Sequence, residues 1–452
     1  MNRGIVIGGG ADALVAAHLL ARAGREVMMV EGATAAEDEG WVPAKVLRAL
    51  RLQGWTMSWP DPWIAVPLPA GGRLELWRDM ARSVESIRRV SPRDAERWPA
   101  FCKRMARLAR FLAALYAEPP PDPLSLGFAL RARRLGREGL QDLLRILPMP
   151  VAELLDDWFE SDALKGALGA GGVRHLLQGP RSGGTAFRLL HHHVGCPPGV
   201  FRPGRSNILE LLRRLPRVEL QQTEVERISV RGGAVTGVAL KDGRSLEASL
   251  VVSSADPRRS LLEFVEPGWL DPDLVRALRH VRRRGVAARL RLQLDRSPGF
   301  AALALAPSLD YLERAYDDAK HGKVSRQPYV EARCDEQHRM EVHVQYTPYG
   351  VECGGLSEKI IALLSEQWGD AVPRESELLS PRELEELERW PQGQPHHAEL
   401  SLDQALWMRP LPELARYRTP VQGLWLCGQG MHPGAGVAGA AGFHCAHEIL
   451  RR

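Results

Sequence analysis

Small residues and one acid near the N-terminus have the spacing that binds a nucleotide. Gly8 and Gly10 are followed by Ala13, and Glu31 stands about 20 positions beyond them. In this pattern the first glycine permits a sharp turn, the second lets backbone N–H groups approach a pyrophosphate, and the third small residue lets a helix pack on a strand. The acid accepts hydrogen bonds from a ribose. We therefore predict a dinucleotide site at Gly8, Gly10, Ala13 and Glu31.

A strand, a helix and a second strand must hold these residues. The run Ile5-Val6-Ile7 is apolar and β-branched, as in a buried parallel strand, and apolar residues recur at helical spacing over 14–21. A second apolar run over 27–30 leads directly into Glu31. The segment therefore predicts a βαβ unit. The alternative is a glycine-rich turn that binds nothing.

Two features count against an ordinary phosphate site. Asp12 lies in the first turn of the predicted helix, where it suits the helix dipole but repels a phosphate. The segment after Glu31 is acidic from Glu37 to Glu39 and contains no arginine before Trp41. We expect weaker pyrophosphate binding on both counts.

The remaining sequence predicts further α/β structure. Residues 218–257 alternate apolar and polar positions between Gly-Gly and Asp-Gly turns, which predicts a β-meander that returns to a buried strand at 250–252. Residues 259–420 mix helices with strands such as "AARLRLQL" and "MEVHVQY", which predicts a second domain. The C-terminal text "GLWLCGQGMHPGAGVAGAAGFHCAHEIL" predicts a strand, a glycine-dense loop and a helix.

Composition limits the class of protein. A chain of 452 residues exceeds the size of one growing core, so two domains are expected. No stretch approaches the roughly 18–20 apolar residues of a spanning helix, and no signal peptide precedes the first strand, so we expect a cytoplasmic protein. The net charge of +5 comes from arginines scattered among acids, which does not indicate nucleic-acid binding.

Cysteine and histidine patterns do not predict a metal site. The six cysteines form no CxxC pair. Adjacent side chains in the triplet at 191–193 point in different directions and cannot chelate one ion together. His396 and His397 follow "WPQGQP" and are expected on a surface loop.

Residues 94–159 predict long helices. The first ends at the proline run 119–121, because proline cannot continue a helix. The next carries leucines at helical spacing, with Arg131, Arg133, Arg134 and Arg137 on other faces. Two interpretations stay open for it: a solvated helix, or a surface-seeking helix that admits a lipid-like substrate or touches an anionic membrane.

Blocks spread over nearly the whole chain resemble the two-domain flavoprotein oxidoreductases. They are "SPRDAERWPAF", "FESDALKGALGAGGV", "GPRSGGTAFRLLHHHVG", "VVSSADPRRSLLEFV", "VQYTPYG" and "LCGQGMHPGAGVAGAAG". More narrowly, the chain resembles the phytoene (carotenoid) desaturase-like family of FAD-dependent oxidoreductases. The branch it is most similar to is that of the pyridine nucleotide-disulfide oxidoreductase domain-containing, phytoene dehydrogenase-related proteins, also called NAD(P)/FAD-dependent oxidoreductases.

The resemblance implies an α/β fold with a Rossmann-like FAD-binding domain and a mixed α+β substrate domain. It places Gly8 and Gly10 at the FAD pyrophosphate, Glu31 at the ribose, and the backbone of Val225 near the adenine. It places a C-terminal loop beneath the flavin, with Gly428, Gly434, Gly436 and Val437 as cofactor-binding residues. His432, just before this loop, is expected either to fix the turn or to influence the flavin.

The resemblance also implies a division of the chain. The FAD-binding domain is expected from 1–60, 206–258 and 421–452. The helical and substrate-domain segment is expected from 61–205, and the remaining substrate domain from 259–420. The family's arginine and Gly-Gly pair after the ribose-binding acid are missing from this sequence.

The leading prediction is an FAD-dependent oxidoreductase that dehydrogenates, desaturates or isomerises an apolar, isoprenoid-like or lipid-like substrate by hydride transfer to flavin. No catalytic residue can be assigned. The alternative is a flavoprotein-like fold with a weakened or empty FAD site that serves as a lipid- or partner-binding subunit. An amine oxidase ranks lower, because the C-terminal loop offers no aromatic pair to face the flavin. Peripheral membrane contact and homo- or hetero-oligomers stay open.

Overall fold

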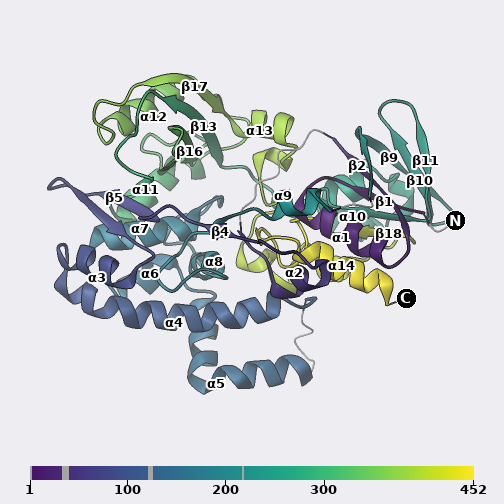
Figure 1. Cartoon of the computed structure of the whole chain (residues 1–452), viewed down its shortest axis with the longest axis horizontal. Helices are drawn as coiled ribbons and strands as arrows, with labels where there is room; N and C mark the ends of the chain where they lie inside the picture. Colours follow the sequence, from purple (N-terminus) through teal and green to yellow (C-terminus); the bar gives the residue numbers. More distant parts are fainter. Residues whose placement is uncertain (1–2, 33–39, 121–125, 216–217, 452) are drawn as a thin grey trace.

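The computed structural model describes residues 3–32, 40–120, 126–215 and 218–451. Figure 1 shows the two termini on the same side, beside a parallel sheet and a small meander. On the opposite side, a layer of helices from α3 to α8 lies below a second sheet. The chain crosses several times between the two sides, so each side contains segments that are far apart in the sequence.

The first sheet is fully parallel and has the order β18-β12-β1-β2-β8. Its central strand β1 (Arg3–Ile7) lies between β2 (Glu26–Glu31) and β12 (Leu250–Ser253), with β8 (Glu219–Gln222) and β18 (Leu424–Leu426) at the edges. The central strands are buried apolar runs, as parallel strands covered on both faces must be. Helices α1 (Ala11–Arg22) and α14 (Ala440–Leu450) pack against each other beside it.

The predicted meander is confirmed. Strands β9 (Val225–Arg231), β10 (Ala234–Leu240) and β11 (Ser245–Glu247) form an antiparallel sheet that leads into β12. The turns between them are the Gly-Gly and Asp-Gly dipeptides of the sequence, and Gly232, Gly233 and Gly243 all have positive φ. The fold class predicted from the sequence, α/β with a Rossmann-like domain, is therefore confirmed.

The second sheet is antiparallel, with the order β14-β15-β16-β13-β17. Its strands are β13 (Ala287–Leu294), β14 (Ala302–Leu305), β15 (Val330–Cys334), β16 (Arg339–Gln345) and β17 (Pro373–Leu379). Alternate residues of β13 and β16, such as Leu290 and Val342, pack on α12 (Leu356–Ser365). The opposite face of the sheet carries charged and polar side chains instead: Arg289, Arg291, Gln293, Glu331, Arg333, Arg339, Glu341, His343, Glu375 and Glu377.

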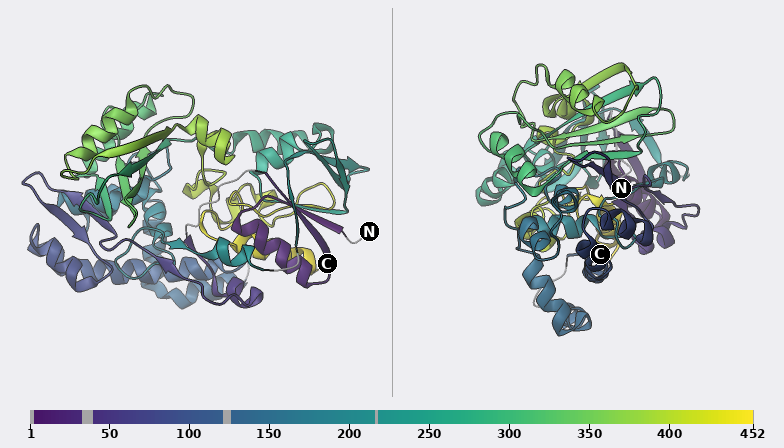
Figure 2. Two further views of the ribbon diagram at one scale, coloured as in Figure 1. Left: turned by 45° about the horizontal axis from the view of Figure 1, so that its top comes forward. Right: turned by 90° about the vertical axis from the view of Figure 1, so that its left-hand side faces the viewer.

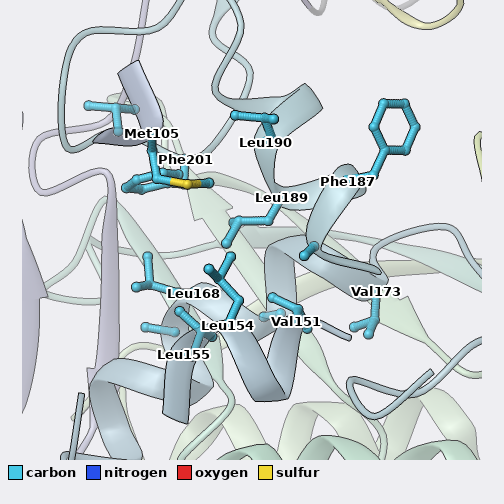
Figure 3. Packing of buried hydrophobic residues seen from close by; sticks show 14 of the residues in the cluster. Met105, Val151, Leu154, Leu155, Leu168, Val173, Phe187, Leu189, Leu190 and Phe201 are labelled. Carbon is cyan, nitrogen blue, oxygen red and sulfur yellow. The ribbon is translucent and has the colours of Figure 1, made fainter. Parts of the chain in front are cut away.

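A helical layer covers the lower left of Figure 1. It consists of α3 (Met80–Arg88), α4 (Pro92–Tyr116), α5 (Leu126–Ile146), α6 (Val151–Asp156), α7 (Asp162–Val173) and α8 (Thr185–His192). The Ser91 side chain caps α4 by accepting a hydrogen bond from the Asp94 N–H, and the helix continues through Pro99. Figure 3 shows its leucine-rich core, with Leu155, Leu168, Leu189 and Phe201 packed between the helices.

Helix α5 projects from the body of the protein (Figure 1 and Figure 2, right). Gly136 has φ 77° and breaks the helix into two parts. Leu130 and Leu144 are 51% and 64% exposed, while Asp142 ties the second half to Arg104 and Arg107 of α4. The two interpretations of this helix, solvated or surface-seeking, therefore both remain predictions.

Shorter elements connect these layers. They are β3 (Gly40–Trp41), α2 (Ala44–Leu50), β4 (Met57–Ser58), β5 (Ile64–Pro67), β6 (Arg73–Leu76), β7 (Arg205–Ser206), α9 (Ile208–Arg213), α10 (Pro272–His280), α11 (Leu309–Lys320), α13 (Pro381–Glu388) and β19 (Gly436–Val437). One apolar core lies around the parallel sheet, a second within the helical layer and a third between the antiparallel sheet and α12. The domain boundaries stay a prediction. Over the described ranges, no helix has both the length and the apolar character to cross a membrane.

Candidate cofactor and substrate site

A cavity of about 1560 Å³, including the space at its mouth, lies at the carboxyl ends of the parallel strands. This is where ligands bind in open α/β sheets. Residues from distant segments line it, among them the turn after β1, the end of β2, α8, the start of β9, the segment after β12, residues 388–397 and the C-terminal loop. Among them are seven of the residues predicted to bind cofactor: Gly8, Gly10, Ala13, Val225, Gly428, Gly436 and Val437.

The glycine turn is as tight as its sequence requires. Gly8 has φ +110°, and a Cβ there would overlap the Ser254 hydroxyl. A Cβ on Gly428 would overlap the Ser254 carbonyl oxygen, so three strand ends meet without side chains between them. Gly10 begins α1 and is different, because a Cβ there would meet no atom within 4 Å. The N-terminus of α1 therefore faces the open cavity.

Glu31 lies beside the glycine turn and is held by an arginine from far along the chain. Arg213 of α9 donates to both Glu31 carboxylate oxygens, at 2.6 and 3.3 Å, and to the Gly9 carbonyl at 3.4 Å. No arginine follows Glu31 in the sequence before Trp41, but Arg213 supplies a cation at this place. The acidic segment, Glu37 to Glu39, lies outside the described residues. Gly40, just beyond it, pairs with Gly436 of the C-terminal loop.

Asp12 faces the N-terminus of α14 as well as the cavity. Its carboxyl accepts a hydrogen bond from the Gly442 N–H at 3.2 Å, and the side chain is buried. Burial raises the pKa of Asp12 from 3.8 to about 7, against the opposing effect of backbone hydrogen bonds. The predicted repulsion of a phosphate is therefore reduced near neutral pH, because part of the Asp12 population is uncharged.

The C-terminal loop is held from beneath by Arg409. Gly434 has φ +100°, and its Cβ position lies 3.0 Å from the Arg409 Nε, so this glycine rests on the guanidinium and does not line the cavity. Arg409 is fully buried and donates to six carbonyl oxygens, those of His396, Ala398, Glu399, Gln404, Gln429 and Met431. Burial lowers the pKa of Arg409 to about 9. One side chain thus joins the 396–404 segment to the loop.

His191 holds the same loop from α8. Its Nε2 lies 2.7 Å from the Ala435 carbonyl oxygen, and its Nδ1 lies 2.9 Å from the Tyr116 hydroxyl. Burial lowers the pKa of His191 to about 3, with a further contribution from Arg188. The neutral ring therefore donates to the loop from Nε2 and accepts from Tyr116 at Nδ1.

The other histidines have different surroundings. Among the described residues, no group of His, Cys, Asp and Glu is arranged to hold a metal ion. Within the triplet, His191 contacts the Ala435 carbonyl, His193 contacts the Val200 carbonyl and His192 lines the cavity. The surface position predicted for His396 and His397 is wrong. Both line the cavity, because Arg409 draws the backbone of this segment inward. His432 is buried against Tyr116 and His444 and does not line the cavity.

A second cavity of about 560 Å³ adjoins the first, since Arg174 and Trp390 line both. It lies over the charged face of the antiparallel sheet. Its other lining residues are His175, Arg205, Ala287, Ala288, Arg289, Glu331, Arg333, Glu341, Val342, His343, Leu384 and Gly393. The two cavities together join the glycine turn, the C-terminal loop and the second sheet.

The residues present fit a dinucleotide such as FAD. Gly10 leaves space for a pyrophosphate at a helix N-terminus, and Glu31 and Val225 lie toward the same end. The loop that precedes α14 also lines the cavity, and the first turn of α14 is joined to the start of α1 by the Gly442–Asp12 hydrogen bond. Ring nitrogens of His192, His396 and His397 at this cavity are buried and lack a hydrogen-bond partner within the described part of the chain.

This arrangement defines the class of protein: a two-domain fold with a Rossmann-like nucleotide-binding domain, as in FAD-dependent oxidoreductases. No family model matches the chain. Among solved structures, putrescine oxidase bound to putrescine superposes with a TM-score of 0.61 and 15% identity, covering 100% of this chain and 99% of that one. Cyclohexylamine oxidase from Brevibacterium oxydans gives a TM-score of 0.55 and 16% identity, with 100% and 99% covered. These likenesses concern the fold.

Similar sequences confirm the resemblance predicted above. Pyridine nucleotide-disulfide oxidoreductase domain-containing protein 2 of Mus musculus is 28% identical over 99% of this chain and 93% of its own. A limonene dehydrogenase subunit of Castellaniella defragrans is 23% identical over 99% and 94%. Hydroxyneurosporene desaturase of Cereibacter sphaeroides is 30% identical over 50% and 48%. The chain is thus related to oxidoreductases and desaturases.

Proposed function

We propose that this protein is an FAD-dependent oxidoreductase that dehydrogenates an organic substrate by hydride transfer to the flavin. One observation carries the proposal: a single cavity runs from the glycine turn at Gly8 and Gly10 to the loop 434–438. The N-terminus of α1 faces this cavity, and the first turn of α14 lies beside it, where Asp12 accepts from the Gly442 N–H.

Each group has a part that follows from its position. Backbone N–H groups at the start of α1 bind the pyrophosphate, and Glu31, oriented by Arg213, accepts from the ribose. FAD held by these residues would supply the oxidant of this half-reaction, a two-electron acceptor for a hydride from the substrate. The substrate also loses a proton, which passes to water. Arg188, which lines the cavity, would favour the negative charge that reduction brings.

The class of substrate is a finer question. The sequence predicted an apolar, isoprenoid-like or lipid-like substrate, and two relatives are named for limonene and hydroxyneurosporene. The second cavity is lined by charged residues such as Arg289 together with apolar ones such as Leu384 and Trp390, so it does not select between the two classes of ligand. Dehydrogenation of a carbon centre is therefore what we propose, and an apolar substrate stays a prediction.

The alternative is a subunit that keeps this fold without its cofactor. It is favoured by the Arg213–Glu31 ion pair, which already occupies the carboxylate intended for a ribose. A carboxylate offers about four acceptor positions, so the ion pair with Arg213 leaves positions for ribose hydroxyls. The ion pair is therefore compatible with a bound cofactor and supports the alternative only weakly. Purification with a partner protein and without flavin would support this alternative.

The visible spectrum of the purified protein tests the proposal. We expect flavin bands and near-stoichiometric release of FAD on denaturation. Gly10→Ala should weaken FAD binding at least about tenfold at unchanged stability of the flavin-free protein, because the added methyl enters the cavity without meeting protein atoms. Gly268→Ala, where a Cβ also meets nothing, is the matched control outside the cavity. A folded, colourless protein that refuses added FAD would overturn the proposal.

A further inference from the structure

An ion pair joins two distant segments of the chain at one end of the first cavity. The Arg389 guanidinium lies 2.5 Å from one carboxylate oxygen of Glu224, and the two residues are 165 positions apart. Both residues line the cavity. Their side chains are 38% and 19% exposed, so the ion pair lies where the cavity meets the solvent.

Glu224 belongs to the nucleotide-binding side of the cavity. It directly precedes β9, and a Cβ on Gly32 would lie 2.7 Å from the Glu224 Cγ, so Glu224 packs just beyond the end of β2. Glu31, the last residue of β2, is the acid proposed to bind the ribose. The cavity beside Glu224 is therefore the place into which the ribose and its attached base extend.

Lys241 fixes the Glu224 carboxylate from the meander. Its ammonium lies 2.5 Å from the second carboxylate oxygen, and its backbone N–H donates to the Glu224 carbonyl at 2.9 Å. The hydrogen bond from Lys241, together with Arg389, lowers the pKa of Glu224, so the carboxylate is ionised at neutral pH. One carboxylate oxygen thus faces its own sheet, and the other faces Arg389.

Arg389 comes from the opposite side of the cavity. It caps the C-terminus of α13 with φ 58°, and both of its neighbours contact the second sheet. Glu388 pairs with Arg291 at 3.3 Å, and the Trp390 ring lies 4.7 Å from the Arg289 guanidinium. These contacts anchor the segment, while Arg389 reaches the other way. Figure 1 shows α13 between the antiparallel sheet and the meander.

An ion pair at such a place can open without unfolding of the protein. Partly exposed pairs add little stability, because water solvates the separated charges, and salt screens their attraction. Neither Arg389 nor Glu224 belongs to one of the apolar cores. Separation of the two side chains therefore removes a link between the two sides of the cavity and leaves both sides folded.

We propose that Arg389 and Glu224 form an ionic clasp that closes over the adenosine end of the bound cofactor and opens when the cofactor enters or leaves. Both are positioning residues and take no part in the chemistry. This inference rests on the proposed function for the identity of the cofactor, FAD. ADP carries the same adenosine and pyrophosphate, so it tests the clasp without flavin.

The rate of FAD release measures the clasp. Flavin-loaded full-length protein is diluted, and the fluorescence of released FAD is followed. Arg389→Gln and Glu224→Gln should each release FAD about two- to fivefold faster than the unaltered protein, as the loss of a partly exposed ion pair predicts. The double variant should release it no faster than either single variant, because both substitutions remove the same interaction.

Two comparisons separate the clasp from general loosening of the protein. FMN lacks the adenosine, so its release should be equal in the unaltered protein and in all three variants. Arg181→Gln is the matched control, since it breaks an exposed ion pair with Asp310, at 2.6 Å, that lines neither cavity. FAD release from Arg181→Gln should equal that from the unaltered protein.

The two single variants also distinguish the clasp from direct binding. Faster FAD release from Arg389→Gln with unchanged release from Glu224→Gln would show that Arg389 contacts FAD itself, which would overturn the clasp. Effects that multiply in the double variant would overturn it as well. Glu224→Gln tests the clasp alone if Arg389→Gln does not fold, because the two substitutions lie on separate segments.

The clasp and the proposed function fail in different ways. A flavin-containing protein whose variants all release FAD at one rate would contradict the clasp and leave the oxidoreductase in place. For a colourless protein, ADP release is measured by surface plasmon resonance. Faster ADP release from both single variants would then support the clasp and contradict the oxidoreductase, whereas failure to bind either FAD or ADP would contradict both.

Discussion

Tyr116 and His191 support the C-terminal loop from outside the cavity, although neither belongs to a nucleotide-binding motif. The Tyr116 hydroxyl, the two ring nitrogens of His191 and the Ala435 carbonyl form one hydrogen-bonded series. Because both side chains are buried, the series fixes the ring and, through it, the loop. These residues position the loop and do not line the cavity.

Removal of one hydroxyl tests this role. Tyr116→Phe should cost about 1 kcal/mol of unfolding free energy and also weaken FAD binding several-fold, since His191 loses its partner. Tyr311→Phe is the matched control, because the Tyr311 hydroxyl donates to the Pro328 carbonyl at 3.0 Å, away from the loop. Urea unfolding and FAD titration measure the two effects. Equal FAD affinity in both variants would show that the Tyr116 hydroxyl is merely structural.

Asp12 gives the protein a pH dependence with a definite sign. Since its pKa rises from 3.8 to about 7 on folding, the folded protein binds the proton more tightly than the unfolded chain between these values. The contribution of Asp12 to stability is therefore full below about pH 4, falls as the pH rises toward 7, and is constant above it. Asp12→Asn removes the titration and keeps an acceptor oxygen.

We expect the stability of Asp12→Asn, relative to the unaltered protein, to increase by at most about 4 kcal/mol from pH 4 to pH 7. Urea unfolding at intervals across this range measures the difference. Asp271→Asn, at the N-cap of α10, provides a comparison in which the carboxylate is an exposed cap. If the difference in stability between Asp12→Asn and the unaltered protein did not change with pH, the raised pKa of Asp12 would be refuted.

At the scale of elements, α7 determines where Arg174 lies. The helix packs closely on the segment before α11, and a Cβ on Gly166 would overlap the Ala306 carbonyl oxygen. Gly169 is similarly close to Leu309, whose Cδ2 is 2.6 Å from the Cβ position. The glycines of this helix therefore permit a close approach, and its C-terminus carries Arg174 to the junction of the cavities.

Gly166→Ala should destabilise the protein by about 1–3 kcal/mol, because the backbone of one element must move away from the other. Gly127→Ala in α5 is the comparison, since a Cβ there meets no atom within 4 Å and alanine favours a helix. Denaturant unfolding measures the change in unfolding free energy for each variant. We expect a loss for Gly166→Ala and no loss, or a gain, for Gly127→Ala. If both variants were equally stable, the helix would have to pack less closely than the structure shows.

At the scale of the whole molecule, the cavity is assembled from segments that also form separate cores. Its lining includes α8 of the helical layer as well as strand ends of the parallel sheet. A ligand that contacts both parts binds only the folded protein, so its binding increases the free energy of unfolding.

Flavin-free protein should therefore gain about 2.7 kcal/mol of stability at FAD concentrations 100-fold above the dissociation constant. FMN, which lacks the adenosine that Glu31 and Val225 are proposed to hold, should stabilise it far less at the same concentration. Thermal unfolding with each flavin measures the difference. Equal stabilisation by FMN and FAD would contradict the proposal that the adenosine part of FAD binds near the glycine turn.

Local sequence patterns predict many of the helices and strands, and they predict the part of the site around the glycine turn. Strand and helix at 5–21, the meander and the C-terminal strand-loop-helix could be predicted because their signals are local: apolar periodicity, turn glycines and an acid at a fixed spacing. Gly8, Gly10 and Gly428 line one cavity because parallel strands bring their carboxyl ends to one edge.

Only the tertiary structure decided which side chains complete the site. Arg213 reaches Glu31 from 182 positions away, and His191 reaches Ala435 from 244. His396 lies in the cavity because Arg409 binds its carbonyl, which no local pattern indicates. The charged face of the second sheet alternates with an apolar one, and a strand's sequence does not say which of its two faces meets the ligand. For that physical reason the alternation predicts the strands but not the ligand that either face of the sheet contacts.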